Sequence, residues 1–351
     1  MRFPEPRTVP LRGGPLLRWG VLGPGEIAGD FVATLHANTD QRVHAVASRS
    51  PERASRFAAR HGIPRSHGDY EQLVADPGID IVYVSSVNSR HRALAELAIA
   101  AGKHVLIEKP IGVDAEDARA IARTARAAGV FAMEAMWSRY LPQTDVLRQL
   151  LDDGTLGDLR LVTADFGADF GTDHSAPVFR EDLGGGVLRD IGIYPVWFAR
   201  FVLGHPVSTF TTGYRAETGV DGQVAMTWTA TNGAQALLHA TMFADTPTVA
   251  SVNGTLGRVE LRSPFLMPDG FDLVKGDERH SWSDESGLRL REGLCWQAVA
   301  IAQHVADGLT ESPIHSLEDS IAIMGILDEA RRLARCEPLQ LGDVAEFQLV
   351  E

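Results

Sequence analysis

Hydrophobic and polar positions divide the chain into two regions of different periodicity. From residue 17 to about residue 136, short apolar runs alternate with longer stretches in which apolar residues recur at helical spacing. The runs predict strands at 19–22, 43–47, 81–85 and 104–107, and the stretches predict helices at 27–37, 52–61, 68–75, 91–101 and 115–128. This alternation is typical of βαβ units, so we predict a doubly wound α/β fold with a parallel sheet.

After Trp137 the pattern changes to longer alternating strands separated by turn dipeptides such as Asn232-Gly233 and Asn253-Gly254. We predict strands at 159–170, 207–214, 224–230, 236–243 and 249–252, and helices at 294–307 and 317–334, with Ser316 as the cap of the second helix. The expected organisation is a loose N-terminal arm (1–15), a Rossmann domain (16–136) and an α+β domain with a large, mostly antiparallel, open-faced sheet (137–351).

The length of 351 residues exceeds the size at which single cores usually stop growing, which agrees with two domains. The formal net charge of -13 argues against nucleic acid or an anionic membrane as a partner, because both need clustered basic residues. The most apolar segment, 191–203, contains Arg200 and is too short to cross a bilayer, so we expect no membrane segment.

The chain has two cysteines, Cys295 and Cys336, which are too few for a disulfide framework. No cluster of cysteine and histidine has the spacing of a zinc site, so we expect no metal. The N-terminus is interrupted by prolines and has no apolar stretch of signal-peptide length. We therefore expect a cytoplasmic protein.

A glycine-rich turn, Gly23-Pro24-Gly25-Glu26-Ile27-Ala28, lies between the first predicted strand and the first predicted helix. In that context Gly23 permits the tight turn, Gly25 lets the backbone approach a diphosphate, and Ala28 keeps the helix close to the strand. The helix N-terminus adds amide groups and a partial positive charge. The turn predicts a dinucleotide site, and the alternative is an ordinary strand-to-helix turn.

The tip of the second predicted strand is Ser48-Arg49-Ser50, where folds that prefer NAD usually have an acidic residue. A carboxylate would repel a 2′-phosphate, whereas Arg49 can bind it through two hydrogen bonds, with the serines as further donors. NADP is therefore favoured over NAD. If Arg49 is only a solvated loop residue, either cofactor is possible.

Six motifs in order resemble the glucose-fructose oxidoreductase and inositol dehydrogenase family. They lie at 23–28, 48–49, 88–91, 102–110, 134–139 and 184–195, and they include Glu108-Lys109-Pro110 and Trp137-Ser138-Arg139. The Trp-Ser-Arg block and a tyrosine at position 194 are most similar to the branch of dimeric dihydrodiol dehydrogenases and NADP-dependent xylose dehydrogenases. The similarity is dense from residue 20 to residue 195 and thin afterwards.

The resemblance implies hydride transfer between a nicotinamide and a ring carbon of a sugar or cyclic diol, with Lys109, Asp190 and Tyr194 as catalytic residues. It also implies a homodimer formed through the C-terminal sheet. Together with the glycine turn and the strand tip, it places the cofactor against Gly23, Gly25, Glu26, Ile27, Ala28, Ser48, Arg49, Ser86, Asn88, His91, Glu108, Lys109, Trp137 and Arg139.

The residues also support a proton-transfer role on chemical grounds. Asp190 and Tyr194 share one face if 188–201 is helical. A phenol has an ordinary pKa of about 10 and needs a nearby cation to work at neutral pH, and we expect Lys109 to lower that pKa. Without the resemblance, the favoured interpretation would be that Tyr194 is a core aromatic and Asp190 a capping or solvated residue.

Two positions depart from the family pattern. Val87 stands before Asn88 where a proline is frequent, and Arg189 stands beside Asp190 where a leucine is frequent. Helical geometry favours an Arg189 side chain that points to solvent, and an inward side chain would instead suit an acidic substrate. The leading interpretation is an NADP-dependent sugar or diol dehydrogenase. The alternatives are a keto-sugar reductase of secondary metabolism that uses the same residues, and a dinucleotide-sensing regulator without catalysis.

Overall fold

The computed structural model describes residues 2–334. Residues 18–134 contain the strands of a six-stranded parallel sheet. Its order is β3-β2-β1-β4-β5-β6, and its strands are β1 (Arg18–Leu22), β2 (Arg42–Ala47), β3 (Arg65–His67), β4 (Ile81–Val84), β5 (His104–Ile107) and β6 (Ala132–Glu134). The strand order reverses between β1 and β4, and open α/β sheets bind ligands at the carboxyl ends of strands beside such a switch point.

Five helices connect these strands: α1 (Glu26–Asn38), α2 (Pro51–His61), α3 (Tyr70–Val74), α4 (His91–Ala100) and α5 (Ala115–Ala128). Ser50, Asp69 and Asp114 cap α2, α3 and α5, since each side chain accepts a hydrogen bond from the backbone N–H three residues later. The α1 helix has no side-chain cap, because Gly25 occupies the cap position. The backbone amides in the first turn of α1 therefore donate no hydrogen bond to a capping side chain.

The second sheet has eight strands in the order β14-β13-β12-β11-β7-β10-β9-β8. They are β7 (Leu159–Gly167), β8 (Ser208–Arg215), β9 (Asp221–Thr229), β10 (Gln235–Thr241), β11 (Ala250–Gly254), β12 (Arg258–Leu261), β13 (Gly270–Lys275) and β14 (Glu278–Ser283). All pairs are antiparallel except β7 with β10. The predicted fold class is confirmed for both domains.

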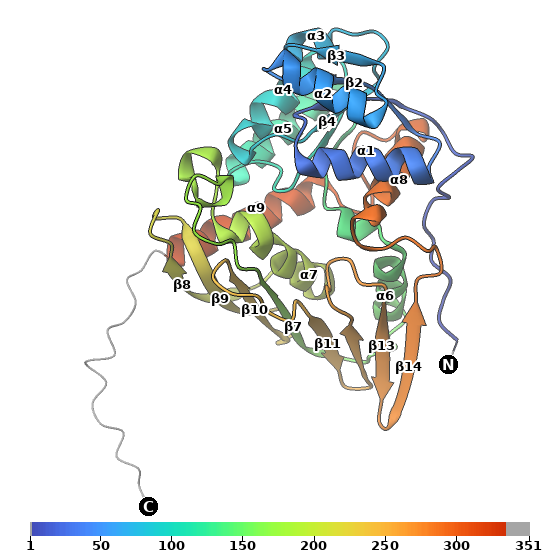
Figure 1. The fold of residues 1–351 in the computed structure, drawn as a ribbon. Coiled ribbons are helices and arrows are strands. Elements are labelled where there is room, and N and C mark those ends of the chain that lie inside the picture. Colours follow the sequence, from blue (N-terminus) through green and yellow to red (C-terminus); the bar gives the residue numbers. More distant parts are fainter. Residues whose placement is uncertain (1, 335–351) are drawn as a thin grey trace, which may run out of the picture.

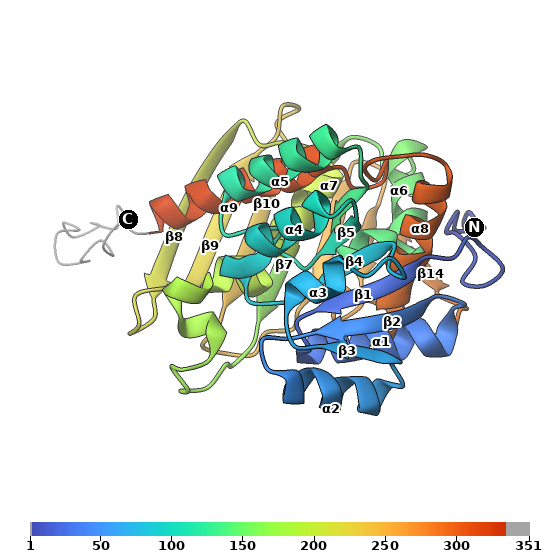
Figure 2. The same ribbon diagram turned by 90° about the horizontal axis from the view of Figure 1, so that it is seen from above.

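Helices cover one face of the large sheet and separate it from the parallel sheet (Figure 1). They include α6 (Pro142–Asp152), α7 (Ile193–Leu203) and α9 (Leu317–Leu333), and α7 packs on β7 and β10. Both α5 of the first domain and α7 of the second contact α9, and Figure 2 shows α9 beside α5. The opposite face of the sheet has no helix on it among residues 2–334.

The last helices return to the first domain. The α8 helix (Cys295–Ala306) and the short 3-10 segment before it, Leu290–Leu294, pack against α1. The other 3-10 segments are Asn88–Arg90, Trp137–Tyr140, Pro177–Phe179 and Glu181–Leu183. Within residues 2–334, none of the helices combines the length and apolarity that crossing a membrane requires.

Several elements differ from the sequence-based expectation. The short strands β3 and β6, the helix α6 and the three strands β12–β14 were not predicted, because their apolar runs are short or interrupted by charged residues. The expected helix over 188–201 is instead a π-helical turn, Leu188–Gly192, followed by α7. Ser316 caps α9 as predicted, through a capping box with Asp319.

The N-terminal arm is packed rather than loose. Phe3 contacts the ring of Phe271 edge-on at 5.6 Å between centroids. Arg7 pairs with Asp145 at the start of α6, with 3.1 Å between Nη2 and Oδ1. The arm therefore crosses the second domain before the chain enters β1.

Candidate active site

The glycine turn after β1 has the backbone geometry that a dinucleotide site needs. Gly23 has a φ of +103°, and a Cβ there would lie 2.6 Å from the carbonyl oxygen of Ser85. Any larger residue would therefore push the turn away from β4. At Gly25 a Cβ would have only that carbonyl within 4 Å, at 3.8 Å, so the space before α1 is open. With the uncapped α1 amides, this turn fits the diphosphate of a dinucleotide.

Arg49, at the tip of β2, is a cation without a charged partner among residues 2–334. Arg49 is exposed and has no hydrogen bond or ion pair within residues 2–334. Ser48 is buried, and its Oγ accepts from the Ser50 amide at 3.2 Å. Ser50 caps α2 and donates its hydroxyl proton to Glu52, so it is less available as a donor than expected. The 2′-phosphate role of Arg49 stays a prediction.

A buried pair of side chains supports the loop after β5. Tyr83 on β4 donates its phenol proton to Oε1 of Glu108 at 2.5 Å, and the Glu108 carboxylate also accepts from the Lys109 amide at 3.1 Å. Burial raises the pKa of Glu108 above its usual range, although Tyr83 and Lys109 oppose that shift. Glu108 thus orients the loop that presents Lys109. Tyr83 was missed in the sequence, where its one signal is a tyrosine within an aliphatic strand.

His91 ties two ends of this loop together. Its Nδ1 lies 2.8 Å from the carbonyl oxygen of Pro110, and its Nε2 lies 3.0 Å from that of Ser86. Burial lowers the pKa of His91. A neutral imidazole donates to one of these carbonyls at a time, so His91 bridges the segments after β4 and β5 through one hydrogen bond and one close contact. A cofactor contact by His91 or Ser86 stays a prediction.

Lys109 meets Asp190 at the π-helical turn. The Lys109 ammonium donates to the backbone carbonyl of Asp190 at 2.6 Å, and its Nζ lies 3.4 Å from Oδ1 of the same residue. A π-helical turn moves carbonyl groups out of the regular helical pattern, and such turns are frequent at functional sites. Burial alone would lower the pKa of Lys109, but Tyr194, Asp190 and Glu108 outweigh it and raise that pKa. Lys109 therefore stays an ammonium group.

Tyr194 lies beside Lys109 and Asp190. The Lys109 ammonium lies 5.2 Å from the centre of the Tyr194 ring, and the indole N–H of Trp137 donates to the phenol oxygen at 3.1 Å. Burial raises the pKa of Tyr194, and Lys109 lowers it only in part. The predicted net depression of this pKa is therefore wrong. The phenol is protonated at neutral pH and ready to act as an acid.

The residue beside Asp190 does not point to solvent. Arg189 is only 5% exposed, and its Nη1 donates to the carbonyl of Gly185 at 3.3 Å. The expectation of an outward side chain is wrong, since it assumed regular α-helical geometry and Arg189 lies in the π-helical turn, where it is buried. Burial lowers the pKa of Arg189, and Glu181 is its nearest carboxylate, at 3.9 Å.

Two contacts that the sequence did not reveal link the domains at the site. Asn88, after β4, donates to the carbonyl of Gly184 at 3.0 Å and so joins the predicted nicotinamide loop to the glycine segment before the π-helical turn. Arg291 contacts Glu26 and Asp30 on α1 at 2.9 and 2.6 Å, next to the glycine turn. Arg291 comes from a segment where the family resemblance is thin.

Arg139 lies apart from Trp137, although both belong to one short 3-10 segment. Its guanidinium carbon lies 4.7 Å from the centre of the Phe201 ring. The structure thus brings Lys109, Asp190, Tyr194 and Trp137 together, and it places Arg139 against the far end of α7. A cofactor contact by Arg139 stays a prediction. Within residues 2–334 no group of three or more His, Cys, Asp or Glu side chains could hold a metal ion.

The fold and the site define an NAD(P)-dependent oxidoreductase, since a dinucleotide turn and a lysine, aspartate and tyrosine meet at one edge of a parallel sheet. Residues 17–136 match the oxidoreductase family with an NAD-binding Rossmann fold, and residues 144–260 match the GFO/IDH/MocA C-terminal domain. The chain belongs to the GFO/IDH/MocA family.

Two related enzymes can be aligned with about nine-tenths of this chain. The trans-1,2-dihydrobenzene-1,2-diol dehydrogenase of Oryctolagus cuniculus is 37% identical over 322 residues, which are 89% of this chain and 97% of the relative. The enzyme of the same name from Homo sapiens is 35% identical over 324 residues, which are 90% and 96% of the two chains.

Two solved structures support the same class. A 3-ketoreductase from Actinomadura kijaniata, in complex with NADP and TDP-benzene, is 28% identical with a TM-score of 0.79, and the match covers 90% of this chain and 97% of that one. An aldose-aldose oxidoreductase from Caulobacter crescentus is 25% identical with a TM-score of 0.81, and the match covers 91% and 97%. The protein is an NAD(P)-dependent dehydrogenase or reductase, and the comparisons disfavour a regulator without catalysis.

Proposed function

We propose that the protein transfers a hydride between NADP and a ring carbon of a sugar or cyclic diol. The observation that carries this proposal is the convergence of Lys109, Asp190 and Tyr194, with Lys109 Nζ 2.6 Å from the Asp190 carbonyl and 5.2 Å from the Tyr194 ring centre. The bound nicotinamide would donate or accept the hydride. The diol dehydrogenases and the aldose oxidoreductase among the relatives support the substrate class.

The proton at the carbinol oxygen is the task of this chain's own residues. Tyr194 gives the proton when a carbonyl is reduced and takes it when a hydroxyl is oxidised. The Lys109 ammonium stabilises the negative charge that develops on the substrate oxygen. The Asp190 side chain is 37% exposed, so its carboxylate is open to accept a hydrogen bond from a substrate hydroxyl.

The preference for NADP rests on Arg49. We expect Arg49→Ala to weaken NADP binding about 10- to 100-fold, the scale of a charge-assisted contact of about 1.5 to 3 kcal/mol. NAD binding should change little, because NAD carries no 2′-phosphate. Fluorescence titration with both reduced cofactors measures this, and Arg53→Ala on the exposed side of α2 is the control. An equal loss for NADPH and NADH contradicts the role of Arg49.

A keto-sugar reductase is the second candidate function, and one observation favours it. Burial raises the pKa of Tyr194 above its ordinary value, which favours the protonated phenol that reduction requires over the phenolate that oxidation requires. The 3-ketoreductase neighbour was solved with NADP. This candidate differs from the first only in the direction of hydride transfer.

A homodimer through the open face of the large sheet is also part of the proposal. Phe210, Leu237 and Val249 are 69%, 45% and 41% exposed, and they line one shallow hollow of about 370 Å³ on that face. Exposed apolar side chains that cluster on a sheet face are typical of a protein interface, and a second copy of the chain is the default partner.

We also infer a cytoplasmic location from the low cysteine content. Cys336 lies outside the described residues.

A substrate screen tests the function. The purified protein is mixed with NADP and a panel of aldoses, inositols and trans-dihydrodiols, or with NADPH and keto-sugars, and NADPH fluorescence is followed. We expect turnover in at least one of these classes, and the faster direction separates the two candidates. The proposal would be contradicted if the protein binds NADPH tightly but turns over no compound of the panel, and if Tyr194→Phe gives the same result.

A further inference from the structure

A polar cavity of about 390 Å³ lies between the end of α7, the start of α9, α6 and the 3-10 segment Trp137–Tyr140. We name it the arginine cavity after three residues in its wall, Arg139, Arg148 and Arg200. Lys109, Asp190 and Tyr194 do not line it. It is therefore distinct from the proposed active site, although both border α7.

Two of the three guanidinium groups are paired. Arg200 donates to Asp319 at 2.6 Å. Arg148 donates to Asp152 from Nε at 2.9 Å and to the carbonyl of Phe201 at 3.2 Å. These contacts fix both side chains in the wall before any ligand arrives.

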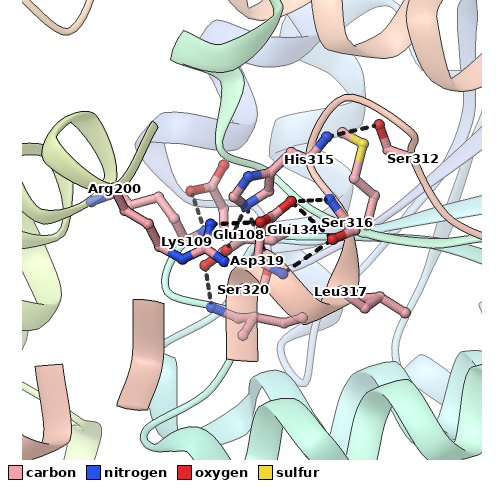
Figure 3. A network of polar contacts seen from close by, with 12 residues as sticks. Glu108, Lys109, Glu134, Arg200, Ser312, His315, Ser316, Leu317, Asp319 and Ser320 are labelled. Atoms are coloured by element: carbon pink, nitrogen blue, oxygen red, sulfur yellow. Dashed lines mark hydrogen bonds and ion pairs between the residues drawn. The ribbon is translucent and has the colours of Figure 1, made fainter. Parts of the chain in front are cut away.

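The wall on the side of Arg200 is rigid. Asp319 also belongs to the capping box of α9, where it accepts from the amide and the hydroxyl of Ser316 at 2.9 and 2.8 Å. His315, another wall residue, lies 3.3 Å from a carboxylate oxygen of Glu134 and is 4% exposed. Figure 3 shows Arg200, Asp319 and His315 in this one connected network. A wall that is ordered in advance lowers the entropic cost of binding.

Arg139 has no comparable partner. Its side chain makes no hydrogen bond or ion pair to any residue in 2–334, and the one specific contact of the guanidinium is the ring face of Phe201 at 4.7 Å. The Nε atom of Arg200 is also buried without a hydrogen-bond partner. Burial, together with the charge of Arg148, lowers the pKa of Arg139. A partly buried guanidinium without a charged partner can gain from pairing, and an anion in the cavity would supply the partner.

We propose that the arginine cavity binds a small oxyanion of the carboxylate or phosphate type, with Arg139 as its principal ligand. The fork of N–H donors in a guanidinium matches two oxygens of such an anion, and five donors of Arg139 are unused. The charges agree with this ligand, because Asp319 and Asp152 balance two arginines and leave one positive charge over. This assigns Arg139 to a ligand other than the dinucleotide.

The test is a titration of the full chain with inorganic phosphate and, separately, with citrate. The ionic strength is held constant with chloride, the melting temperature is recorded, and saturating NADPH is present so that the cofactor site is filled. We expect a saturable rise with at least one anion, and the tighter of the two identifies the phosphate or the carboxylate type. Arg139→Gln should weaken the binding about 10- to 100-fold.

Two further variants make the result specific. Arg123→Gln removes an exposed arginine that pairs with Glu116 on α5, and it should bind the anion like the unchanged protein. Arg139→Lys keeps a charge but not the fork, and it should weaken binding less than Arg139→Gln does. Circular dichroism and the melting temperature without added anion show whether each variant is folded.

Three results would overturn the proposal. The first is a response to the anions that persists undiminished in Arg139→Gln. The second is a response that appears only without NADPH and is lost in Arg49→Ala, because the anion then occupies the cofactor site. The third is no saturable response of the unchanged protein up to about 50 mM of either anion, which is weaker than useful binding of a small ligand.

Discussion

At the scale of single residues, the environment of Tyr194 decides how the site can work. Its ring is buried, Trp137 donates to its oxygen, and Lys109 lies over its face. Burial acts against ionisation of the phenol and the ammonium acts for it, and burial is the larger effect. The balance leaves a neutral phenol beside a fixed cation.

Tyr194→Phe keeps the ring and its packing but removes the proton. We expect the turnover number to fall roughly 10²- to 10⁴-fold, the range for a lost general acid or base, with little change in NADP affinity or melting temperature. Steady-state kinetics and thermal unfolding measure both. Tyr70→Phe, on α3 of the first domain, is the matched control. A near-normal rate in Tyr194→Phe would assign the proton to another group.

Lys109→Met removes the cation that opposes the effect of burial, so the pKa of Tyr194 should rise further. Oxidation needs the deprotonated phenol, and its rate should therefore increase with pH and level off at a higher pH in the variant. Reduction needs the protonated phenol, so its rate should stay flat through neutral pH and decline only at a higher pH. The measurement is the turnover number against pH in both directions. If the turnover number of Lys109→Met depends on pH as that of the unchanged protein does, even at a lower rate, Tyr194 does not titrate in the reaction.

At the scale of elements, the π-helical turn Leu188–Gly192 is held in place by β9 and α9. Asp221 at the start of β9 accepts from the Leu188 amide at 2.8 Å and from Arg331 on α9 at 3.0 Å. Asp221 and Arg331 are 8% and 10% exposed, so this pair is shielded from solvent. The turn that carries Asp190 is thus positioned by residues far away in the sequence.

Asp221→Asn removes one of the two carboxylates that pair with Arg331, while Glu181 stays at 2.9 Å, and it weakens the bond to the Leu188 amide. We expect a loss of about 1 to 3 kcal/mol in the free energy of unfolding, the cost of an impaired charged hydrogen bond in a buried site. The KM for the substrate should rise as well, because Asp190 is less well fixed. Denaturant unfolding and kinetics measure the two effects. Asp277→Asn, at an exposed turn, should change neither, and a silent Asp221→Asn would mean that the turn is held by its own backbone.

At the scale of the whole molecule, one face of the large sheet is covered by helices and the other is exposed. One face is covered by α7 and α9, and the other presents Phe210, Leu237 and Val249. The free face is large and regular, as self-association about a two-fold axis requires.

Leu237→Glu places a charge on the free face, within the interface of the proposed dimer. We expect the dimer to dissociate at micromolar concentration, and light scattering should then give the monomer mass. Leu256→Glu is the control, since Leu256 is 63% exposed at the turn between β11 and β12. A monomeric mass of the unchanged protein would contradict the dimer directly.

The sequence by itself determined the parallel sheet, the glycine turn and most helices of the first domain. These features depend on local periodicity and on turn or cap residues that are neighbours in the chain, such as Ser50, Asp114 and Gly23. The resemblance to the family also singled out Lys109, Asp190 and Tyr194, and their catalytic roles stay a prediction.

Only the tertiary structure decided how those groups interact. The inward turn of Arg189, the raised pKa of Tyr194 and the contact of Asn88 with Gly184 depend on burial and on partners distant in sequence. The same holds for the arginine cavity, whose wall comes from α6, α7, α9 and a 3-10 segment. Solvation and long-range contacts are properties of the packed chain, so no local pattern of residues encodes them.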